Sequence, residues 1–392
     1  MIVPINAKTE RIIVCGILGL AVALRVVAAI IIPDQSHALV DAIAYRDSAA
    51  LLSKNWQMDN LYQMPLYPLL IAITGPGTAQ LGADIVLSVT SVWLVYAMTG
   101  ELFGDAYSRI FACAAAACYP PLIFFSVVGL SEILFITLVL ASFLCWYRGR
   151  FTLAAIFAVL AVLTRPVFDP FAPLLVLLFA LVVHRLPVKK ALQHLGIYFI
   201  IYCALMTPWW LHNYRAYGSF VRLTPGAGVA LYAGNNPLNH SGGGNLGVDY
   251  DLSAFANITD PIERDRALRS AAIGYIVHNP RRFLELAALK FLRIWEIVPV
   301  NEAYRSPGII ILSIASFVPL LVLAGLGLFV KRQRLRKLSP ILVFGFCYVL
   351  VHMILVGTIR YRLPLEPFLI VFAGAGVSYL LQTLRPTLAI SR

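Results

Sequence analysis

The chain has 392 residues, of which 60% are hydrophobic and 13% charged, and its mean hydropathy is +0.81. A soluble domain of this length cannot bury so much apolar surface, so the composition indicates a membrane protein. The formal net charge of +12 also occurs in nucleic-acid-binding proteins. The placement of the basic residues along the chain argues against that class.

Long apolar stretches follow one another along most of the chain. A bilayer core about 30 Å thick is crossed by a helix of roughly 20 apolar residues. The stretches are continuous and do not alternate with period two, which favours helices over a β-barrel. We expect ten transmembrane helices, near residues 11–32, 79–100, 107–126, 130–147, 151–165, 168–184, 190–209, 308–330, 338–357 and 364–384.

Lysine and arginine gather at the two ends of the chain and in alternate connections between the predicted helices. If the ten helices alternate in direction, all of these clusters face one side, which the positive-inside rule makes the cytoplasm. Both termini are then cytoplasmic, and the positive charge serves topology and contact with anionic lipid. The clusters are Lys8 and Arg11; Arg148 and Arg150; Arg185, Lys189 and Lys190; Lys331, Arg332, Arg334, Arg336 and Lys337; and Arg385 and Arg392.

The first long connection on the extracytoplasmic side runs from about residue 33 to 78. Within it, residues 41–55 show helical spacing of apolar residues, so we expect a short helix along the membrane surface. Residues 64–75 are apolar but too short to span a bilayer, and two prolines interrupt them early. This pattern indicates an interfacial or re-entrant element.

The second long connection runs from about residue 210 to 307. It contains a Gly- and Asn-rich stretch at 226–247, which we expect to be mobile. A basic and aromatic segment with helical periodicity follows at 260–297 and is typical of a helix lying on a membrane surface. Residues 1–392 therefore form a single transmembrane domain, and its two long extracytoplasmic loops are the places where function is usually found.

Common motifs of other enzyme classes are absent from the sequence. It contains no GxxxxGK[ST], no GxGxxG following a predicted strand, no HExxH and no GxSxG. The pattern therefore argues against a nucleotide-driven pump, a dehydrogenase, a zinc protease and an α/β-hydrolase.

Three acids on the outer face are candidates for catalysis. Asp41 lies where the first predicted helix has left the bilayer, and Asp47 follows six residues later. A carboxylate there can act as a general base that takes a proton from an attacking hydroxyl; the alternative is a solvated loop acid. Glu132 begins the fourth predicted helix, where the helix dipole also favours an acid for structural reasons alone.

Three arginines lie at the same outer face, against the topogenic bias. Arg165 ends the fifth predicted helix, and Arg360 and Arg362 lie in IRYRLP between the ninth and tenth. Arginine forks match phosphate oxygens, so we expect a shared anion; the alternative is contact with lipid headgroups. In an extended connection, residues two apart point to the same side, so Arg360 and Arg362 could reach one phosphate.

Four further residues are candidates for binding a sugar or an acceptor: Tyr45, Tyr67, Asn213 and Asn235. The two amides suit sugar hydroxyls, although Asn235 in Asn-Asn-Pro also suits a turn. An acid at the membrane surface, a cluster of arginines and two long loops together suit a reaction on a lipid-linked phosphate substrate.

An ordered set of short motifs gives the chain a resemblance to a known family. DAIAYRDSAALL fits the pattern D-x3-Y-x3-A-x2-L and precedes MPLYPLLIA; then come SEILF, LTRP, PWWLHNYRAYG, LYAGNNP, HNPRRFLELAALKFLRIW and RYRLPLEP. From about residue 12 to 382 this set resembles bacterial glycosyltransferase family 39, the protein-mannosyltransferase-like enzymes of the GT-C superfamily. The fold that the resemblance implies is an all-α, GT-C-like bundle of about ten transmembrane helices.

The resemblance implies a polyprenyl-phosphate-linked sugar as donor, with no nucleotide at the active site. It also implies an inverting transfer on the extracytoplasmic face of the bacterial inner membrane. The usual candidate base of the family corresponds to Asp41. Many relatives carry two adjacent acids there, whereas Ala42 follows Asp41 here, so a second acid would be Asp47 or Glu132. Members of the superfamily differ in metal dependence, which leaves a divalent metal open.

We therefore interpret the chain as a membrane glycosyltransferase that moves a hexose or pentose to a hydroxyl of a lipid, glycan or protein. In this interpretation Asp41 deprotonates the acceptor, and the arginines stabilise the departing phosphate. One alternative is a transporter or flippase of lipid-linked glycans, which the scarcity of acids inside the predicted helices disfavours. Another is a polymerase or ligase of such glycans, which the early Asp41 loop disfavours.

Overall fold

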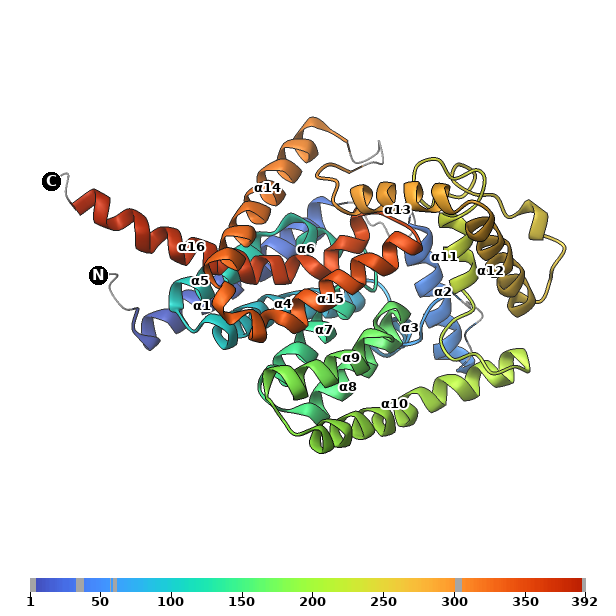
Figure 1. Cartoon of the computed structure of the whole chain (residues 1–392), viewed down its shortest axis with the longest axis horizontal. Coiled ribbons are helices and arrows are strands. Elements are labelled where there is room, and N and C mark those ends of the chain that lie inside the picture. Colours follow the sequence, from blue (N-terminus) through green and yellow to red (C-terminus); the bar gives the residue numbers. More distant parts are fainter. Residues whose placement is uncertain (1–4, 33–38, 57, 59–61, 300–304, 390–392) are drawn as a thin grey trace.

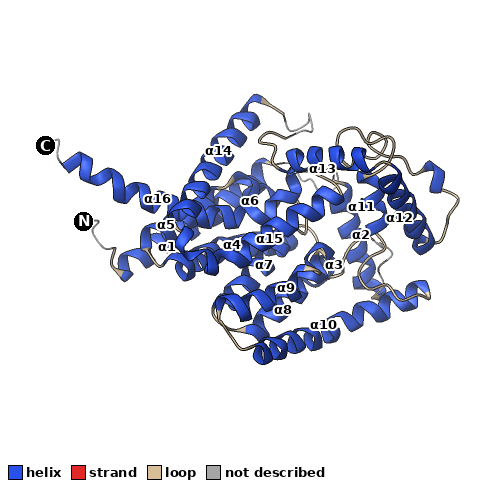
Figure 2. Cartoon of the chain, in the orientation of Figure 1, coloured by secondary structure: helices blue, strands red, loops and turns tan. Residues whose placement is uncertain are grey.

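The computed structural model describes residues 5–32, 39–56, 58, 62–299 and 305–389. Over these ranges the chain consists of helices joined by loops, with no strand (Figure 2). One isolated bridge joins Leu246 to Tyr250. The predicted all-α fold class is therefore confirmed. Parts of both predicted loops, and Arg392 among the basic residues, lie outside the described residues.

The described chain contains seven helical stretches that are long and apolar enough to cross a membrane. Three shorter apolar helices complete a one-to-one correspondence with the ten predicted transmembrane helices. The long stretches are α1 (Ala7–Ile31), α4 (Thr78–Phe103), Pro166–Val183, α10 (Val188–Tyr217), α14 (Pro307–Val330), Arg332–Ile354, which contains α15 (Leu335–Ile354), and Ile359–Leu384, which runs into α16 (Glu366–Ala389). The shorter helices are α5 (Ala106–Cys118), α7 (Glu132–Tyr147) and α8 (Phe151–Thr164).

The third predicted transmembrane helix, 107–126, is broken in the structure. The helix α5 ends at Cys118, and α6 (Pro120–Phe125) begins after Tyr119, whose backbone is extended. A residue that precedes a proline is disfavoured in the α conformation, which explains the break. Arg25 of α1 is fully buried beside the break and donates a hydrogen bond to the carbonyl of Ala117 at 3.1 Å.

The sixth predicted helix, 168–184, is also irregular. It consists of a short 3-10 turn, η2 (Pro166–Phe168), the helix α9 (Phe171–Leu177) and a π-helical end, η3 (Leu178–Val183). In contrast, α10 continues to Tyr217, past the predicted end at 209, although Pro208 lies within it.

Both long connections contain helices of their own. In the first, α2 (Val40–Asn55) matches the predicted helix, and α3 (Leu66–Thr74) takes up the short apolar run. In the second, the segment predicted to be one helix divides at Asn279–Pro280 into α12 (Pro261–His278) and α13 (Pro280–Ile294). The membrane-surface position of these helices stays a prediction.

The Gly- and Asn-rich stretch at 226–247 differs from the expectation of a mobile loop. It contains α11 (Ala227–Gly234), and the side chains of Asn235, Asn236 and Asn239 are fully buried. The amide nitrogen of Asn239 donates to the carbonyls of Ala233 at 2.7 Å and Gly243 at 2.8 Å. Here the small residues allow close packing, and the buried amides supply hydrogen bonds that a regular element would otherwise provide.

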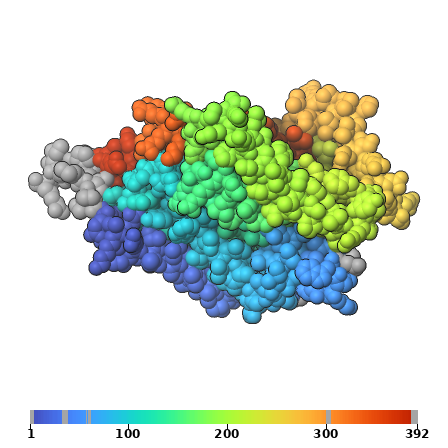
Figure 3. Space-filling view, turned by 90° about the horizontal axis from the view of Figure 1, so that it is seen from below, coloured from blue at the N-terminus to red at the C-terminus, as the bar shows by residue number. Residues whose placement is uncertain are grey.

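The bundle is elongated and has two chemically different ends. The start of α1 and the end of α16 lie at one end, while α2, α11, α12 and the last turns of α10 gather at the other (Figures 1 and 3). At the first end, Arg148 pairs with Glu101 at 2.7 Å, and Arg334 donates to the carbonyl of Leu102 at 2.6 Å. The basic connections and the long loops thus lie at opposite ends of the bundle, as the predicted topology requires.

An aromatic core joins α7, which begins with Glu132, to helices that follow it in the chain. The ring of Phe143 in α7 lies 5.7 Å from Phe179, 5.6 Å from Phe344 and 4.9 Å from Phe368, measured between centroids. All four side chains are buried. Edge and tilted aromatic contacts at these distances are favourable beyond the area they bury. The core therefore fixes α7 relative to α15 and α16.

We predict the orientation of the bundle from these two ends. In a variant without native cysteines, a cysteine at position 240 should react with a membrane-impermeant maleimide added outside intact cells. A cysteine at position 333, in the basic connection between α14 and α15, should react only after permeabilisation. Labelling of both positions from the same side would contradict the topology.

Candidate functional site

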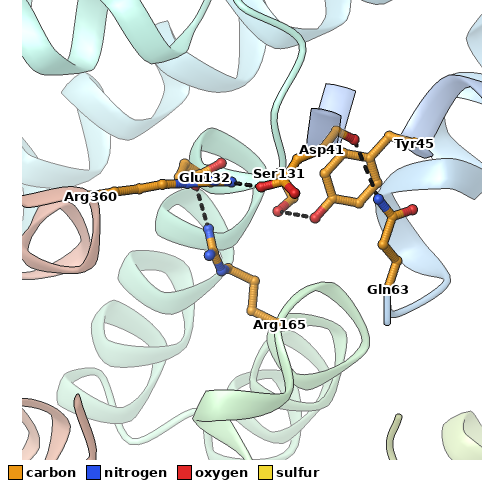
Figure 4. Close-up of polar contacts among 7 residues, drawn as sticks. All are labelled: Asp41, Tyr45, Gln63, Ser131, Glu132, Arg165 and Arg360. Carbon is orange, nitrogen blue, oxygen red and sulfur yellow. Dashed lines mark hydrogen bonds and ion pairs between the residues drawn. The ribbon is translucent and has the colours of Figure 1, made fainter. Parts of the chain in front are cut away.

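Four charged side chains from four separate elements form one cluster at the end of the bundle where the two long loops lie. Asp41 lies in the first turn of α2, and Glu132 is the first residue of α7. Arg165 follows the last residue of α8, and Arg360 belongs to the 3-10 helix η7 (Ile359–Leu365). Figure 4 shows the two arginines converging on Glu132.

Glu132 is the centre of this cluster. Its Oε1 atom accepts hydrogen bonds from the Nη1 of Arg165 at 2.7 Å and from the Nε of Arg360. The Nη1 of Arg360 also lies 2.5 Å from the Oδ2 of Asp41. The side chain of Glu132 is fully buried, so the two arginines compensate a charge that would otherwise be very unfavourable there.

Tyr45 packs beside Asp41 and Glu132. Its hydroxyl lies 2.8 Å from the hydroxyl of Ser131, the residue before Glu132. Burial raises the pKa of Tyr45, so its hydroxyl stays protonated at neutral pH. The side-chain nitrogen of Gln63 donates to the backbone carbonyl of Asp41 at 3.3 Å and holds the start of α2.

A cavity of about 280 Å³ lies in front of this cluster. Asp41, Tyr45, Arg165 and Arg360 line it, whereas Glu132 lies behind the two arginines. The side chain of Asp41 is 51% exposed, so a hydroxyl group can approach its carboxylate. The remaining lining residues are Val40, Ala44, Tyr62, Gln63, Met64, Thr164 and Pro166.

The structure therefore brings together Asp41, Tyr45, Glu132, Arg165 and Arg360 among the residues chosen from the sequence. The structure shows that these five side chains lie close together, whereas their roles stay predictions. Each comes from an end of a predicted apolar helix or from the first loop, which is why charge in an otherwise apolar chain was an informative signal.

Four other candidates lie away from the cavity. Asp47 is exposed on a different face of α2, and Asn213 in α10 is buried and donates to the carbonyl of Val221 at 3.2 Å. Tyr67 is buried behind Tyr45, with ring centroids 5.0 Å apart, and its hydroxyl donates to Asp84 at 2.8 Å. Asn235 is buried within the second loop.

Arg362 is also separated from the cluster. The segment was expected to be extended, but η7 is a 3-10 helix with three residues per turn, so residues two apart point in different directions. Arg362 is buried, bonds Glu366 at 2.7 Å and donates to the carbonyl of Glu296 at 2.6 Å. Its guanidinium carbon also lies 3.5 Å from the ring centroid of Phe317. The expectation that both arginines face one anion is wrong in its geometry.

Several residues of the site were missed in the sequence. Ser131, Met64 and Thr164 lie within the quoted motifs SEILF, MPLYPLLIA and LTRP but were given no role of their own, and Tyr62 and Gln63 lie outside those motifs. Gln63 could have been found from its place just before the apolar run at 64–75. The others become site residues only through the contact of α2 with the ends of α7 and α8.

Two carboxylates in one cluster raise the question of a metal ion. Within the described ranges, no three His, Cys, Asp or Glu side chains gather in a way that could hold one. The guanidinium of Arg360 lies between Asp41 and Glu132, with the charge of Arg165 also on Glu132. A divalent cation there would face both arginines, so these residues do not fit a metal and we derive no step through one.

Comparison of the sequence with family models and with curated proteins gives no match. Among solved structures, the chain is similar to the oligosaccharyltransferase of Archaeoglobus fulgidus at 13% sequence identity. The TM-score is 0.56 for its apo form, with 96% of this chain and 52% of that chain covered. It is 0.57 for a complex with Zn and sulfate, with 95% and 50% covered.

A third structure of that archaeal protein, AglB with an inhibitory peptide and a dolichol-phosphate, gives a TM-score of 0.55 at 13% identity and covers 96% and 51% of the two chains. This chain thus spans about half the length of these proteins. The likeness shows the fold alone: over nearly all of this chain, the helical bundle matches that of the archaeal oligosaccharyltransferase.

The buried position of Glu132 leads to a prediction about stability. Glu132→Gln removes the only carboxylate in contact with Arg165 among the described residues, so it leaves the largely buried guanidinium of Arg165 without a compensating charge. Breaking such a pair costs about 3–5 kcal/mol. Asp41→Asn, at a half-exposed pair, should cost about 0–1 kcal/mol. Thermal unfolding in detergent should rank the two variants in this order, and equal losses would contradict the central position of Glu132.

Proposed function

We propose that the chain is a membrane glycosyltransferase that transfers a sugar from a polyprenyl-phosphate-linked donor to an acceptor hydroxyl on the extracytoplasmic face. The observation that carries the proposal is the cavity in which a half-exposed carboxylate, Asp41, faces the same space as two arginines, Arg165 and Arg360. A base and a phosphate-binding pair are the two groups that such a transfer requires.

The arginines suit the phosphate of the donor. An arginine carries five N–H donors, and the contacts with Asp41 and Glu132 use only some of them. Glu132 binds both guanidinium groups from behind the cavity, which leaves their other N–H groups to line it. Arginines fixed in this way need little reorganisation when negative charge develops on a leaving phosphate.

Entry of a phosphate would also release the base. In the structure described, Asp41 is paired with Arg360. A donor phosphate that takes the fork of Arg360 replaces this ion pair, so the carboxylate of Asp41 becomes able to accept a proton. Substrate binding and activation of the base are then coupled through one guanidinium.

The transfer itself involves one bond made and one broken. The acceptor hydroxyl loses its proton to Asp41, and its oxygen forms a bond to the anomeric carbon of the sugar. The bond between that carbon and the phosphate oxygen breaks, and polyprenyl phosphate leaves with the electron pair. Arg165 and Arg360 stabilise its charge, and attack opposite the leaving group inverts the anomeric configuration.

The likeness to solved structures agrees with a lipid-linked donor. The archaeal neighbour is described with a dolichol-phosphate, a polyprenyl-type lipid phosphate, and with an inhibitory peptide. We propose the same chemical class of donor for this chain, in the bacterial inner membrane with both termini in the cytoplasm. The acceptor is a hydroxyl of a lipid, a glycan or a protein.

The proposed base is tested by paired substitutions on one helix. Asp41→Asn keeps the shape of the side chain but cannot take the proton, so the transfer rate should fall by about 10²–10⁴. Asp47→Asn, exposed on the same helix, should leave the rate nearly unchanged. Loss of sugar from a polyprenyl-phosphate donor is the measurement, with folding checked by size-exclusion chromatography. An active Asp41→Asn variant would exclude this base.

The proposed phosphate site predicts a contrast between two nearby arginines. Lysine keeps the charge but loses the fork, and a charge-assisted hydrogen bond contributes about 1.5–3 kcal/mol. Arg360→Lys should therefore raise the donor KM roughly 10–100-fold. Arg362→Lys should lower thermal stability, and it should raise the donor KM of the folded fraction much less than Arg360→Lys does, because Arg362 lies away from the cavity. The reverse pattern would mean that Arg362 contacts the donor.

A further inference from the structure

The segment that leads into Arg360 is hydrogen-bonded to the second long loop, residues 210–307. Residues 355–358 connect the end of α15 at Ile354 with η7, and Arg360 is the second residue of η7. The last carbonyl groups of a helix have no partner within the helix and must find one elsewhere. The carbonyl of Ile354 is one of these, and it accepts two hydrogen bonds from the second loop, from Asn235 at 2.8 Å and from Lys290 at 3.1 Å.

A lysine is an unusual residue to donate a hydrogen bond to a buried helix carbonyl. Its side chain is fully buried, and its amine donates to the side-chain oxygen of Asn235 at 3.0 Å as well as to Ile354. Both of these acceptors are neutral oxygens. Burial lowers the pKa of Lys290 to about 7, which agrees with an amine held in place for its hydrogen bonds.

Around these side chains, the backbone of the second long loop is in close contact with the backbone of residues 355–357. A Cβ atom on Gly234 would lie 1.6 Å from the carbonyl oxygen of Leu355, and one on Gly357 would lie 2.4 Å from that of Lys290. The amide of Gly357 also donates to the carbonyl of Gly242 at 3.2 Å. The close approach explains why small residues stand on both sides of the contact.

The same helix also holds the chain just after Arg360. Arg362 donates to the carbonyls of Ile294 at 3.3 Å and Glu296 at 2.6 Å, at and beyond the end of α13. The helix α13 therefore contacts the path of the chain on both sides of Arg360, through Lys290 before it and through these carbonyls after it.

From these contacts we infer that Asn235 and Lys290 are positioning residues, which clamp residues 354–357 and so place Arg360 between Glu132 and Asp41. The effect on donor use rests on the proposed function, whereas the effect on the segment does not. The second outer loop then acts on the phosphate site indirectly, through the position of one guanidinium.

The test uses the full-length protein with Lys290→Met, which keeps most of the side-chain volume but loses both hydrogen bonds. Hydrogen–deuterium exchange of the peptide covering residues 354–360 should become about tenfold faster, while exchange in α4 and α7 stays unchanged. The donor KM should rise by about 10-fold, within the range expected for Arg360→Lys, with a smaller effect on kcat. Arg281→Met, exposed on the same helix, is the matched control and should change neither.

A second variant covers the case in which Lys290→Met does not fold. Gly357→Ala pushes the segment away from the backbone of Lys290 and should give the same local exchange and the same rise in donor KM. Unchanged exchange at 354–360 in the folded variants would overturn the clamp itself. Faster exchange with an unchanged donor KM would overturn the inference that the clamp positions Arg360 for the donor. If the parent protein transfers no sugar, the proposed function fails, and the exchange measurement alone decides whether the clamp exists.

Discussion

A single buried carboxylate organises the end of the bundle where the two long loops lie. Glu132 lies where α7 begins, out of reach of solvent, and binds Arg165 and Arg360 at once. A buried charge of this kind is tolerated only when it is paired, so the end of α8 and the helix η7 must lie against the start of α7. This contact forms the cavity, places its two arginines and sets the position of Asp41.

The fold explains how such a cluster forms in an apolar chain. The aromatic core around Phe143 fixes α7 against the later helices, and the first outer loop brings α2 across the end of the bundle. Charged residues at the outer ends of distant helices thereby come within hydrogen-bond distance. Membrane helices tolerate ionisable groups mainly where they pair or line a cavity, so pairing and function are both expected at this place.

Much of this arrangement could be predicted from the sequence. Long apolar runs predict the helices, and acids or arginines at their outer ends predict Asp41, Glu132, Arg165 and Arg360. Side-chain direction in short irregular segments could not be predicted. An extended connection would place Arg362 on the same side as Arg360, whereas the 3-10 helix η7 points the two side chains in different directions. Similarly, the Gly- and Asn-rich composition of 226–247 predicts a mobile loop. The buried hydrogen bonds of Asn235 could not be predicted, because they depend on residues distant in sequence.

The central claim is that the cavity breaks a lipid-linked sugar from its phosphate instead of moving the intact lipid across the membrane. The direct measurement is the fate of a polyprenyl-phosphate-linked sugar in proteoliposomes that contain the purified protein and a range of acceptors. The account predicts loss of the sugar from the lipid, with one polyprenyl phosphate released for each sugar transferred. Appearance of the unaltered lipid-linked sugar in the opposite leaflet, without release of polyprenyl phosphate, would contradict it.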